Sequence, residues 1–246
     1  MDVLLVDTAL ALVFVAFVSL IRPLRFLGVR TRRTATVLAA AGLALFLLGL
    51  FLPVSPPRFE GPRMTLDEVL PVYQFGEAHE IRIQAPPERV FAAVKEVTAR
   101  EIRFFRLLTW LRSPHFGAAR ESILNPAADQ PILGVALRSG FVLLREEPGR
   151  EVVLGMIVCC GRRRPPRDAD EFQSLQGSLA RAVMNFYLTD EGGGVTRLVT
   201  QTRVAASDAS AERRFAVYWR LIYPGSAFIR HMWLDAIRRR AEARID

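Results

Sequence analysis

Histidine moves protons readily near neutral pH, and this chain has three histidines, His79, His115 and His231. They fall in unrelated contexts: an early strand, a loop after Pro114 and the polar face of the last helix. The sequence contains no Ser-His-Asp order, nucleophile elbow, glycine-rich phosphate loop or cluster with metal-ligand spacing. We therefore predict no catalytic residues, no metal and no cofactor, although residues distant in sequence can still meet in a fold.

The most informative charged side chain is Arg230, in the final helical stretch. On a helical wheel it lies on the apolar side, next to Trp233 and Ile237. A buried charge needs a partner, and a ligand carboxylate or phosphate held by a bidentate contact is one interpretation. The interpretation that we favour is an ion pair with a carboxylate of the sheet or a loop, or an alkyl stem on apolar surface with its head in water.

Hydroxyl and aromatic side chains supply the other candidate contacts. In the strand Val195 to Val204, one face carries arginines and is the expected solvent side, so Thr200 and Thr202 are predicted to point inward. The last helix is dense in aromatic residues, which could hold a flat apolar ligand or simply form core. The predicted ligand-binding residues are Thr200, Thr202, Trp219, Tyr223, Arg230 and Trp233.

The elements that must position these residues follow from periodicity and turn signals. Strand patterns cover residues 78–85, 140–145, 151–158, 180–188 and 195–204, and helical patterns cover 88–100, 102–111 and 209–244. Short turns join successive strands, which indicates an antiparallel meander. The last helix is expected to be interrupted at Tyr223-Pro-Gly225, with Ser226 capping the piece that follows. The fold class is α+β.

The passage Ala85-Pro-Pro-Glu-Arg-Val-Phe91 follows the first strand and opens the first helix. Together with the order of elements, it resembles the START-like superfamily, also called SRPBCC or polyketide cyclase-like, through Ala85, Pro86, Val90 and Phe91. The resemblance covers roughly residues 76–244. It implies a helix-grip fold, in which a curved antiparallel sheet surrounds a long C-terminal helix and leaves an apolar cavity for lipids, polyketides or other hydrophobic molecules. Some members catalyse cyclisation or dehydration, and others only contact proteins.

Two apolar stretches, residues 3–21 and 35–54, precede this domain, and each is long enough to cross a hydrocarbon core about 30 Å thick as a helix. The alternative of a cleaved signal peptide is disfavoured because the basic residues follow the first stretch and no small-residue cleavage pattern closes it. We predict a transmembrane hairpin over residues 1–54, a proline-rich linker over 55–75 and a START-like domain over 76–246. The bilayer is then a partner through both stretches.

Charge sets the expected orientation and excludes one class of partner. The loop between the stretches carries five arginines, which places it in the cytoplasm and the C-terminal domain outside. The formal net charge of +8 does not indicate nucleic-acid binding, because the hairpin argues against it and no recognised nucleic-acid motif is present. Basic runs such as Arg162–Arg167 suit either a solvated loop or contact with anionic lipid. Cys159 and Cys160 are adjacent and are expected to be alternately facing strand residues.

The function that these observations favour is a membrane-tethered START-like domain that binds a hydrophobic ligand, a lipid or lipid-like metabolite, between its sheet and its last helix. An enzyme of the cyclase or dehydratase kind is the first alternative. An interaction module whose cavity is filled by its own side chains is the second. The excess of arginine over the single lysine, Lys95, is typical of high-GC bacterial proteins.

Overall fold

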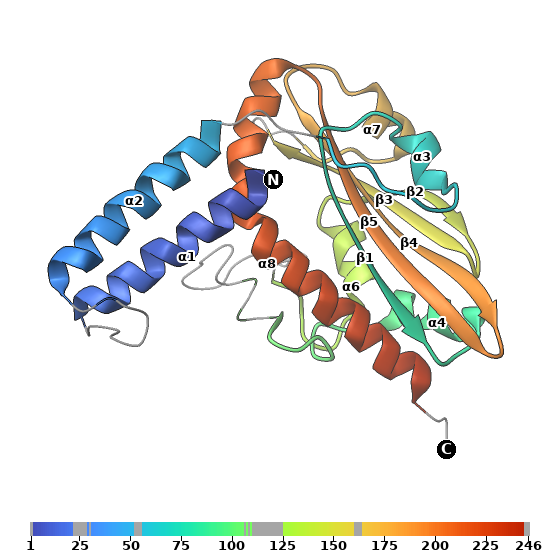
Figure 1. Cartoon of the computed structure of the whole chain (residues 1–246). Helices are drawn as coiled ribbons and strands as arrows, with labels where there is room; N and C mark the ends of the chain where they lie inside the picture. The colour runs from blue at the N-terminus through green and yellow to red at the C-terminus, as the bar shows by residue number, and fades with distance from the viewer. Residues whose placement is uncertain are drawn as a thin grey trace. The chain divides into compact units, whose positions relative to one another are not determined.

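The computed structural model describes residues 2–21, 29, 31–51, 56–105, 107, 109, 125–159 and 164–243. The chain divides into two compact units. One contains residues 1–55 with the segment Ala216–Pro224, and the other contains Pro56–Phe215 with Gly225–Asp246. Figure 1 shows the elements of both along the chain.

In the first unit, helices α1 (Asp2–Ile21) and α2 (Arg32–Phe51) each run for 20 residues, or about 30 Å. They pack closely through small residues: a Cβ built on Gly42 would lie 2.9 Å from Val13 Cγ2 and 3.3 Å from the Ala9 carbonyl oxygen. Ala16 and Ala35 are also fully buried. By length and hydropathy, the described residues contain one candidate span, Arg32–Gly49 in α2, so the two-span hairpin stays a prediction.

The second unit is built on a five-stranded antiparallel sheet with the order β1-β5-β4-β3-β2. Its strands are β1 (Phe75–Ile83), β2 (Val142–Glu147), β3 (Glu151–Cys159), β4 (Ala180–Gly192) and β5 (Val195–Ala206). Tight turns join β2 to β3 and β4 to β5, while β1 crosses to pair with β5. The long helix α8 (Ala209–Glu242) follows β5. The predicted α+β architecture, with an antiparallel sheet and a long C-terminal helix, is confirmed.

The inner face of this sheet packs against α8 and α4 (Pro87–Glu96). Phe186 and Leu154 from the sheet meet Trp233 and Ile237 from α8 in one buried apolar cluster. The helix α6 (Ile132–Arg138) adds Ile132 and Leu133 to the same cluster. Burial of these side chains is the main stabilisation of the domain, since each fully buried large apolar side chain contributes about 1.5–3 kcal/mol.

The outer face is covered by α3 (Thr65–Val69) and α7 (Ala169–Ser174), which Figure 1 draws on the side of the sheet away from α8. Leu66 and Phe172 are 0% and 1% exposed there. The segment treated above as part of a linker therefore supplies core residues. Prolines exclude regular helix but not burial, and the sequence pattern does not separate the two.

This cover also changes the environment of the arginine-bearing face of β5, so the expectation that this face is solvated is wrong at Arg203. That side chain is 5% exposed, and its Nη2 donates to Asp67 Oδ1 (2.6 Å) and to Gln201 Oε1 (3.0 Å). Beside it, the buried carboxylate of Glu151 accepts from the Thr65 backbone N–H and from Asn185 Nδ2, both at 2.7 Å. These contacts fasten residues 64–67 to the sheet.

The helix α8 is continuous over 34 residues, with Pro224 inside it, so the predicted interruption at residues 223–225 is wrong. It begins at Asp208, whose side chain accepts from the backbone N–H groups of Ser210 and Ala211 at 2.8 Å. An internal proline removes one helical hydrogen bond but need not end a helix that is held by packing on both sides. Of the predicted helix over 102–111, residues 105, 107 and 109 are helical, residues 102–104 form a bend and turn instead, and the other four residues lie outside the described part of the chain, as do Cys160 and His115.

Candidate functional site

Two polar side chains on the edge strand β1 face the helix α8. Inward-facing positions of β1 alternate from Phe75 through Glu77 and His79 to Ile83. Glu77 is 3% exposed as a residue, and the side chain of His79 is 10% exposed. The strand thus carries a carboxylate and an imidazole into a mostly apolar interior.

Arg230 of α8 meets both strands that lie under it. Its Nη2 donates to Thr202 Oγ1 (2.7 Å) and its Nη1 to Thr200 Oγ1 (3.2 Å). Its Nε lies 3.8 Å from Glu77 Oε1. These contacts match the ion-pair interpretation of this arginine, with the carboxylate coming from the sheet.

Glu77 is held from three directions. Ser226 Oγ donates to its Oε1 (2.8 Å), and His79 Nε2 lies 3.5 Å from its Oε2. Burial would raise the pKa of the Glu77 carboxyl, but the contact with His79, the charge of Arg230 and the Ser226 hydroxyl outweigh burial and lower that pKa. Ser226 therefore binds the sheet carboxylate and is not a helix cap.

His79 contacts a second histidine across the interface between β1 and α8. The rings of His79 and His231 are 4.5 Å apart at 67°. Burial and the neighbouring His79 lower the pKa of His231, while Glu77 opposes that shift. Two of the three histidines that look scattered in the sequence therefore meet in the fold.

The structure brings together four of the six predicted ligand-binding residues: Thr200, Thr202, Arg230 and Trp233. The Arg230 guanidinium lies 5.6 Å from the centre of the Trp233 ring, which also packs edge-on against Phe186 at 5.1 Å. Trp219 and Tyr223 contact each other at 5.6 Å, within the segment Ala216–Pro224 that belongs to the first unit. Their role in binding stays a prediction.

Two hydrogen-bond donors beside Arg230 have no acceptor among the described residues. Trp233 Nε1 is buried and makes no hydrogen bond there. The Thr202 hydroxyl accepts from Arg230, which leaves its own hydrogen to donate. Thr200 differs, because its hydroxyl donates to the Asn185 carbonyl oxygen at 2.7 Å.

Sequence reasoning missed Glu77, His79, Ser226 and His231. One signal was available: Glu77 and His79 share the strand parity of Phe75, Ile81 and Ile83, so an inward-facing carboxylate could have been inferred. The contact of these side chains with α8 could not have been inferred, because it depends on how that helix packs on the sheet. The contacting residues of α8 lie more than 145 positions after Glu77 in the sequence.

This polar cluster, which we define as Glu77, His79, Thr200, Thr202, Ser226, Arg230, His231 and Trp233, has a defined chemistry. The carboxylate and the guanidinium balance each other, the hydroxyl of Thr202 and the indole N–H are donors, and the imidazole of His79 can exchange a proton with Glu77. Among the described residues, no group of three or more His, Cys, Asp or Glu side chains can hold a metal ion.

Comparison with known proteins adds little to this geometry. No family profile matches the sequence, and no curated protein matches it. Solved structures that resemble the fold include a conserved protein from Geobacillus kaustophilus, with 12% identity over 68% of this chain and 95% of that one, at a TM-score of 0.35. A Mesorhizobium loti protein has 18% identity over 67% of this chain and 98% of that one, at a TM-score of 0.32. An aromatase/cyclase from a Streptomyces species has 13% identity over 69% of this chain and 96% of that one, at a TM-score of 0.28. At these TM-scores the likenesses carry no argument about function.

Proposed function

We propose that this chain is a membrane-tethered START-like domain that binds a hydrophobic ligand, a lipid or lipid-like metabolite, between its sheet and α8. The observation that carries the proposal is the polar cluster, which places unused hydrogen-bond donors beside a large apolar core. Small-molecule sites combine apolar walls with a few placed polar groups. The polar cluster supplies such groups, and the inner core of the sheet supplies the walls.

The helix-grip assignment is supported by the topology and by the passage after β1. Pro86 and Pro87 start α4, while Val90 and Phe91 are 0% and 8% exposed in the inner core. A proline at the first helical position suits a helix start, because its missing N–H has no partner there. The long α8 then covers the inner face of a sheet whose first and last strands pair directly.

The membrane tether is supported by the packing of α1 and α2. Small residues lie between these helices, while Phe14 and Phe17 of α1 and Leu43 and Leu48 of α2 are each more than half exposed. In water such a surface is unfavourable, and in a lipid bilayer it is the normal arrangement. The five arginines of the intervening loop favour a cytoplasmic loop and an extracytoplasmic C-terminal domain.

The unused donors narrow the ligand to one that carries a hydrogen-bond acceptor, such as a carbonyl, hydroxyl or carboxylate oxygen, on an apolar body. A buried donor without an acceptor costs roughly 1–3 kcal/mol, so an acceptor at Trp233 Nε1 would recover that loss. Arg230 need not leave Glu77 for this, because the Thr202 hydroxyl that accepts from Arg230 still has its own hydrogen to donate.

The test is native mass spectrometry of the full chain in a mild detergent, before and after unfolding, to detect a small molecule that is released. We expect a released ligand from the natural chain and less from Trp233→Phe and Thr202→Val, which remove the donors but keep most of the volume. Ile237→Val, a similar small deletion elsewhere on α8, is the matched control and should retain the ligand. A folded chain that releases nothing would favour an interaction module with a filled interior.

A second candidate function, acid–base catalysis, is favoured by the contact of His79 with Glu77. A carboxylate that orients an imidazole is the usual arrangement of a general base, and His231 offers a second titratable ring. On this proposal the chain acts on the bound molecule, for example by removing water from it, as a cyclase or dehydratase would.

Comparison of ligands from the natural chain and from His79→Gln distinguishes binding from catalysis. If His79 is a base for dehydration, the variant should accumulate a ligand heavier by one water than that of the natural chain. Identical ligands at equal occupancy would exclude this catalytic role and leave binding as the function.

A further inference from the structure

The turn between α4 and α6 exposes large apolar side chains although the chain around it is firmly anchored. Phe104 is 63% exposed and Leu107 is 60% exposed. Between and beside them, Ile102 and Phe105 are each 3% exposed and pack into the inner core. The exposure of Phe104 and Leu107 is therefore not a sign of a poorly packed turn.

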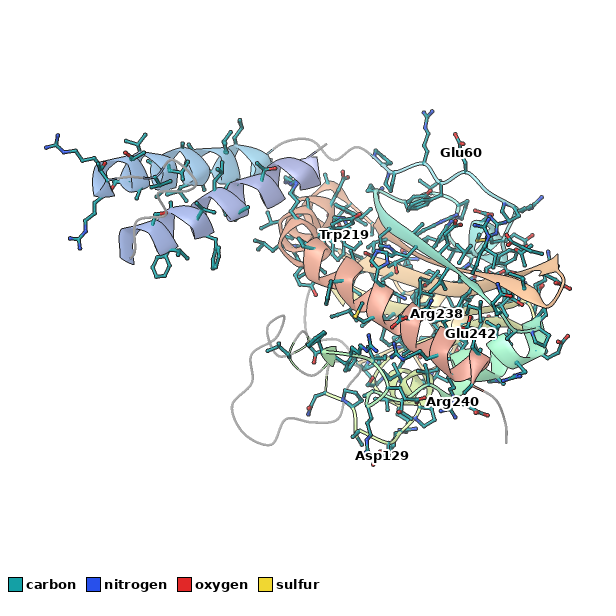
Figure 2. The ribbon with its side chains drawn as sticks, turned by 60° about the horizontal axis from the view of Figure 1, so that its bottom comes forward. Glu60, Asp129, Trp219, Arg238, Arg240 and Glu242 are labelled. Atoms are coloured by element: carbon teal, nitrogen blue, oxygen red, sulfur yellow. The ribbon has the colours of Figure 1, made fainter. Side chains whose placement is uncertain are left out.

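Hydrogen bonds and ion pairs fix the turn on both sides. Glu101 accepts from the Thr98 backbone N–H and hydroxyl, both at 2.8 Å, and from Arg240 Nη1 at 2.9 Å. The Arg100 backbone N–H donates to the Ala128 carbonyl oxygen (3.1 Å), and its side chain pairs with Asp129. Figure 2 labels Arg240 and Asp129, two side chains to which the turn is tied.

Phe104 has an unusual backbone conformation. Its φ is +57°, and among the described residues it is the one non-glycine with a positive φ. This left-handed region suits glycine or asparagine and is unfavourable for a bulky residue. The chain thus holds Phe104 in a strained backbone conformation that exposes its aromatic ring, and this exposure is unfavourable in water.

Phe104 and Leu107 border an open pocket of about 430 Å³, whose other lining residues include Ile102, Phe105, Pro126 and the charged Arg100. Arg100 and Arg103, which belong to the same turn, are both exposed. An aromatic ring, an aliphatic side chain and flanking arginines are the side chains that suit the boundary between lipid headgroups and acyl chains. Arg100 already pairs with Asp129, and the charge of Arg103 complements anionic headgroups, which a neutral protein partner would not require.

We propose that a membrane-contact turn, defined as residues 100–105 and 107, inserts Phe104 and Leu107 into an anionic bilayer surface. The contact is separate from the polar cluster and rests on the proposed membrane tether, which keeps the domain at high effective concentration near lipid. Insertion gives the ring of Phe104 an apolar environment and brings anionic headgroups close to Arg103.

The experiment uses the full chain in vesicles of phosphatidylcholine and phosphatidylglycerol with brominated acyl chains, which quench tryptophan fluorescence on contact. The reporter is Phe104→Trp, measured as the increment over the natural chain with its three tryptophans. Its added emission should fall by roughly half, because interfacial side chains insert about 5–10 Å into the boundary of headgroups and acyl chains. The matched control is Val72→Trp, at a position that is 73% exposed in the segment between α3 and β1.

Quenching of Phe104→Trp without quenching of Val72→Trp would support the contact. Equal quenching at both positions, or none at Phe104→Trp, would overturn it and point to a protein partner for this surface. A chain that does not enter the vesicles would overturn the tether and the contact together. Those two failures are distinguished by flotation of the vesicles before fluorescence is read.

A second pair of variants tests the contact without disturbing the backbone of the turn. Phe104→Asn suits the left-handed backbone and removes the aromatic ring, so the turn should keep its shape. In a chain that carries Leu107→Trp as the reporter, adding Phe104→Asn should reduce quenching, and omission of phosphatidylglycerol should reduce it further. Unchanged quenching in both cases would contradict the proposal.

Discussion

The hairpin and the sheet domain place the same kinds of side chain on opposite sides. The buried positions of α1 and α2 include Ala9, Ala16, Ser19, Ala35 and Gly42, while large side chains such as Phe14 and Leu43 are exposed. In the sheet domain phenylalanine, leucine and tryptophan are inside. The difference is explained if the two regions are surrounded by different solvents. Water drives large apolar side chains into the interior, whereas lipid does not. Helices in lipid therefore associate through small residues that let their backbones approach closely.

The largest expected effect comes from making the same substitution in both regions. Leu234→Ala, at a position 1% exposed in the inner core, should lower the free energy of unfolding by about 2–5 kcal/mol. Leu47→Ala, at a position 47% exposed on α2, should change it by less than about 0.5 kcal/mol, because no packed cavity is created. Denaturant titration of the full chain in detergent measures both, and equal losses would contradict the inside-out description of the hairpin.

In the hairpin, enlarging a small buried residue should be more destabilising than changing a large exposed one. Gly42→Leu puts atoms where Val13 and the Ala9 backbone already lie, and overpacking of this kind costs about 1–3 kcal/mol. Leu43→Phe, at the neighbouring position that is 53% exposed, is the matched control and should be tolerated. The measurement is crosslinking between α1 and α2 in membranes. Undiminished crosslinking of Gly42→Leu would show that the helices do not meet at Gly42.

An effect of intermediate size is expected where residues 64–67 pack on the outer face of the sheet. Asp67 receives Arg203 Nη2 at 2.6 Å and the Met64 backbone N–H at 2.8 Å. Asp67→Ala removes both contacts and leaves Arg203 with Gln201 and a backbone carbonyl, at a cost of about 1–3 kcal/mol. Limited proteolysis within residues 56–74 should become faster. The exposed pair of Arg63 with Glu68 gives the control, because Glu68→Ala should change stability by less than about 1 kcal/mol.

The parts of the fold that were predictable from the sequence are those with strong local periodicity. The strands and the last helix were found because β-alternation and helical spacing extend over many residues, as from Val195 to Ala206. α6 and α7 were missed because helices of 7 and 6 residues carry too little periodic signal. The continuous passage of α8 through Pro224 was missed because packing, which a local rule does not contain, decides it.

Only part of the polar cluster was predictable from the sequence. The inward threonines and Arg230 followed from one-strand and one-helix patterns, and the contacts of Arg230 with Thr200 and Thr202 agree with them. Glu77 and His79 needed knowledge that the first strand pairs with the last, since only then do they lie under Arg230. Long-range pairing of this kind leaves no mark in the spacing of residues along the chain.

The smallest expected effect is a pH dependence confined to the sheet domain. The folded pKa of His231 is lowered below its ordinary 6.5, so the unfolded chain binds the proton more readily and stability falls as pH decreases through that region. The folded pKa of Glu77 is lowered below 4.5, so its contribution is complete above that pH and is lost as pH falls through the folded pKa. Both pKa shifts therefore make the folded domain less stable as the pH falls.

Denaturant midpoints at a series of pH values, for the natural chain, His231→Gln and Glu77→Gln, separate these contributions. His231→Gln should flatten the decline that begins near pH 6.5, and Glu77→Gln should reduce the steeper decline below pH 4.5 without abolishing it, because Glu101, Glu171 and Asp208 also have lowered pKa values. Crosslinking of α1 to α2 through residues 8–21 and 34–49 should stay constant over the same range, since neither of these segments contains a titratable side chain. A hairpin that separates together with the sheet domain on acidification would show that the two units are not independent.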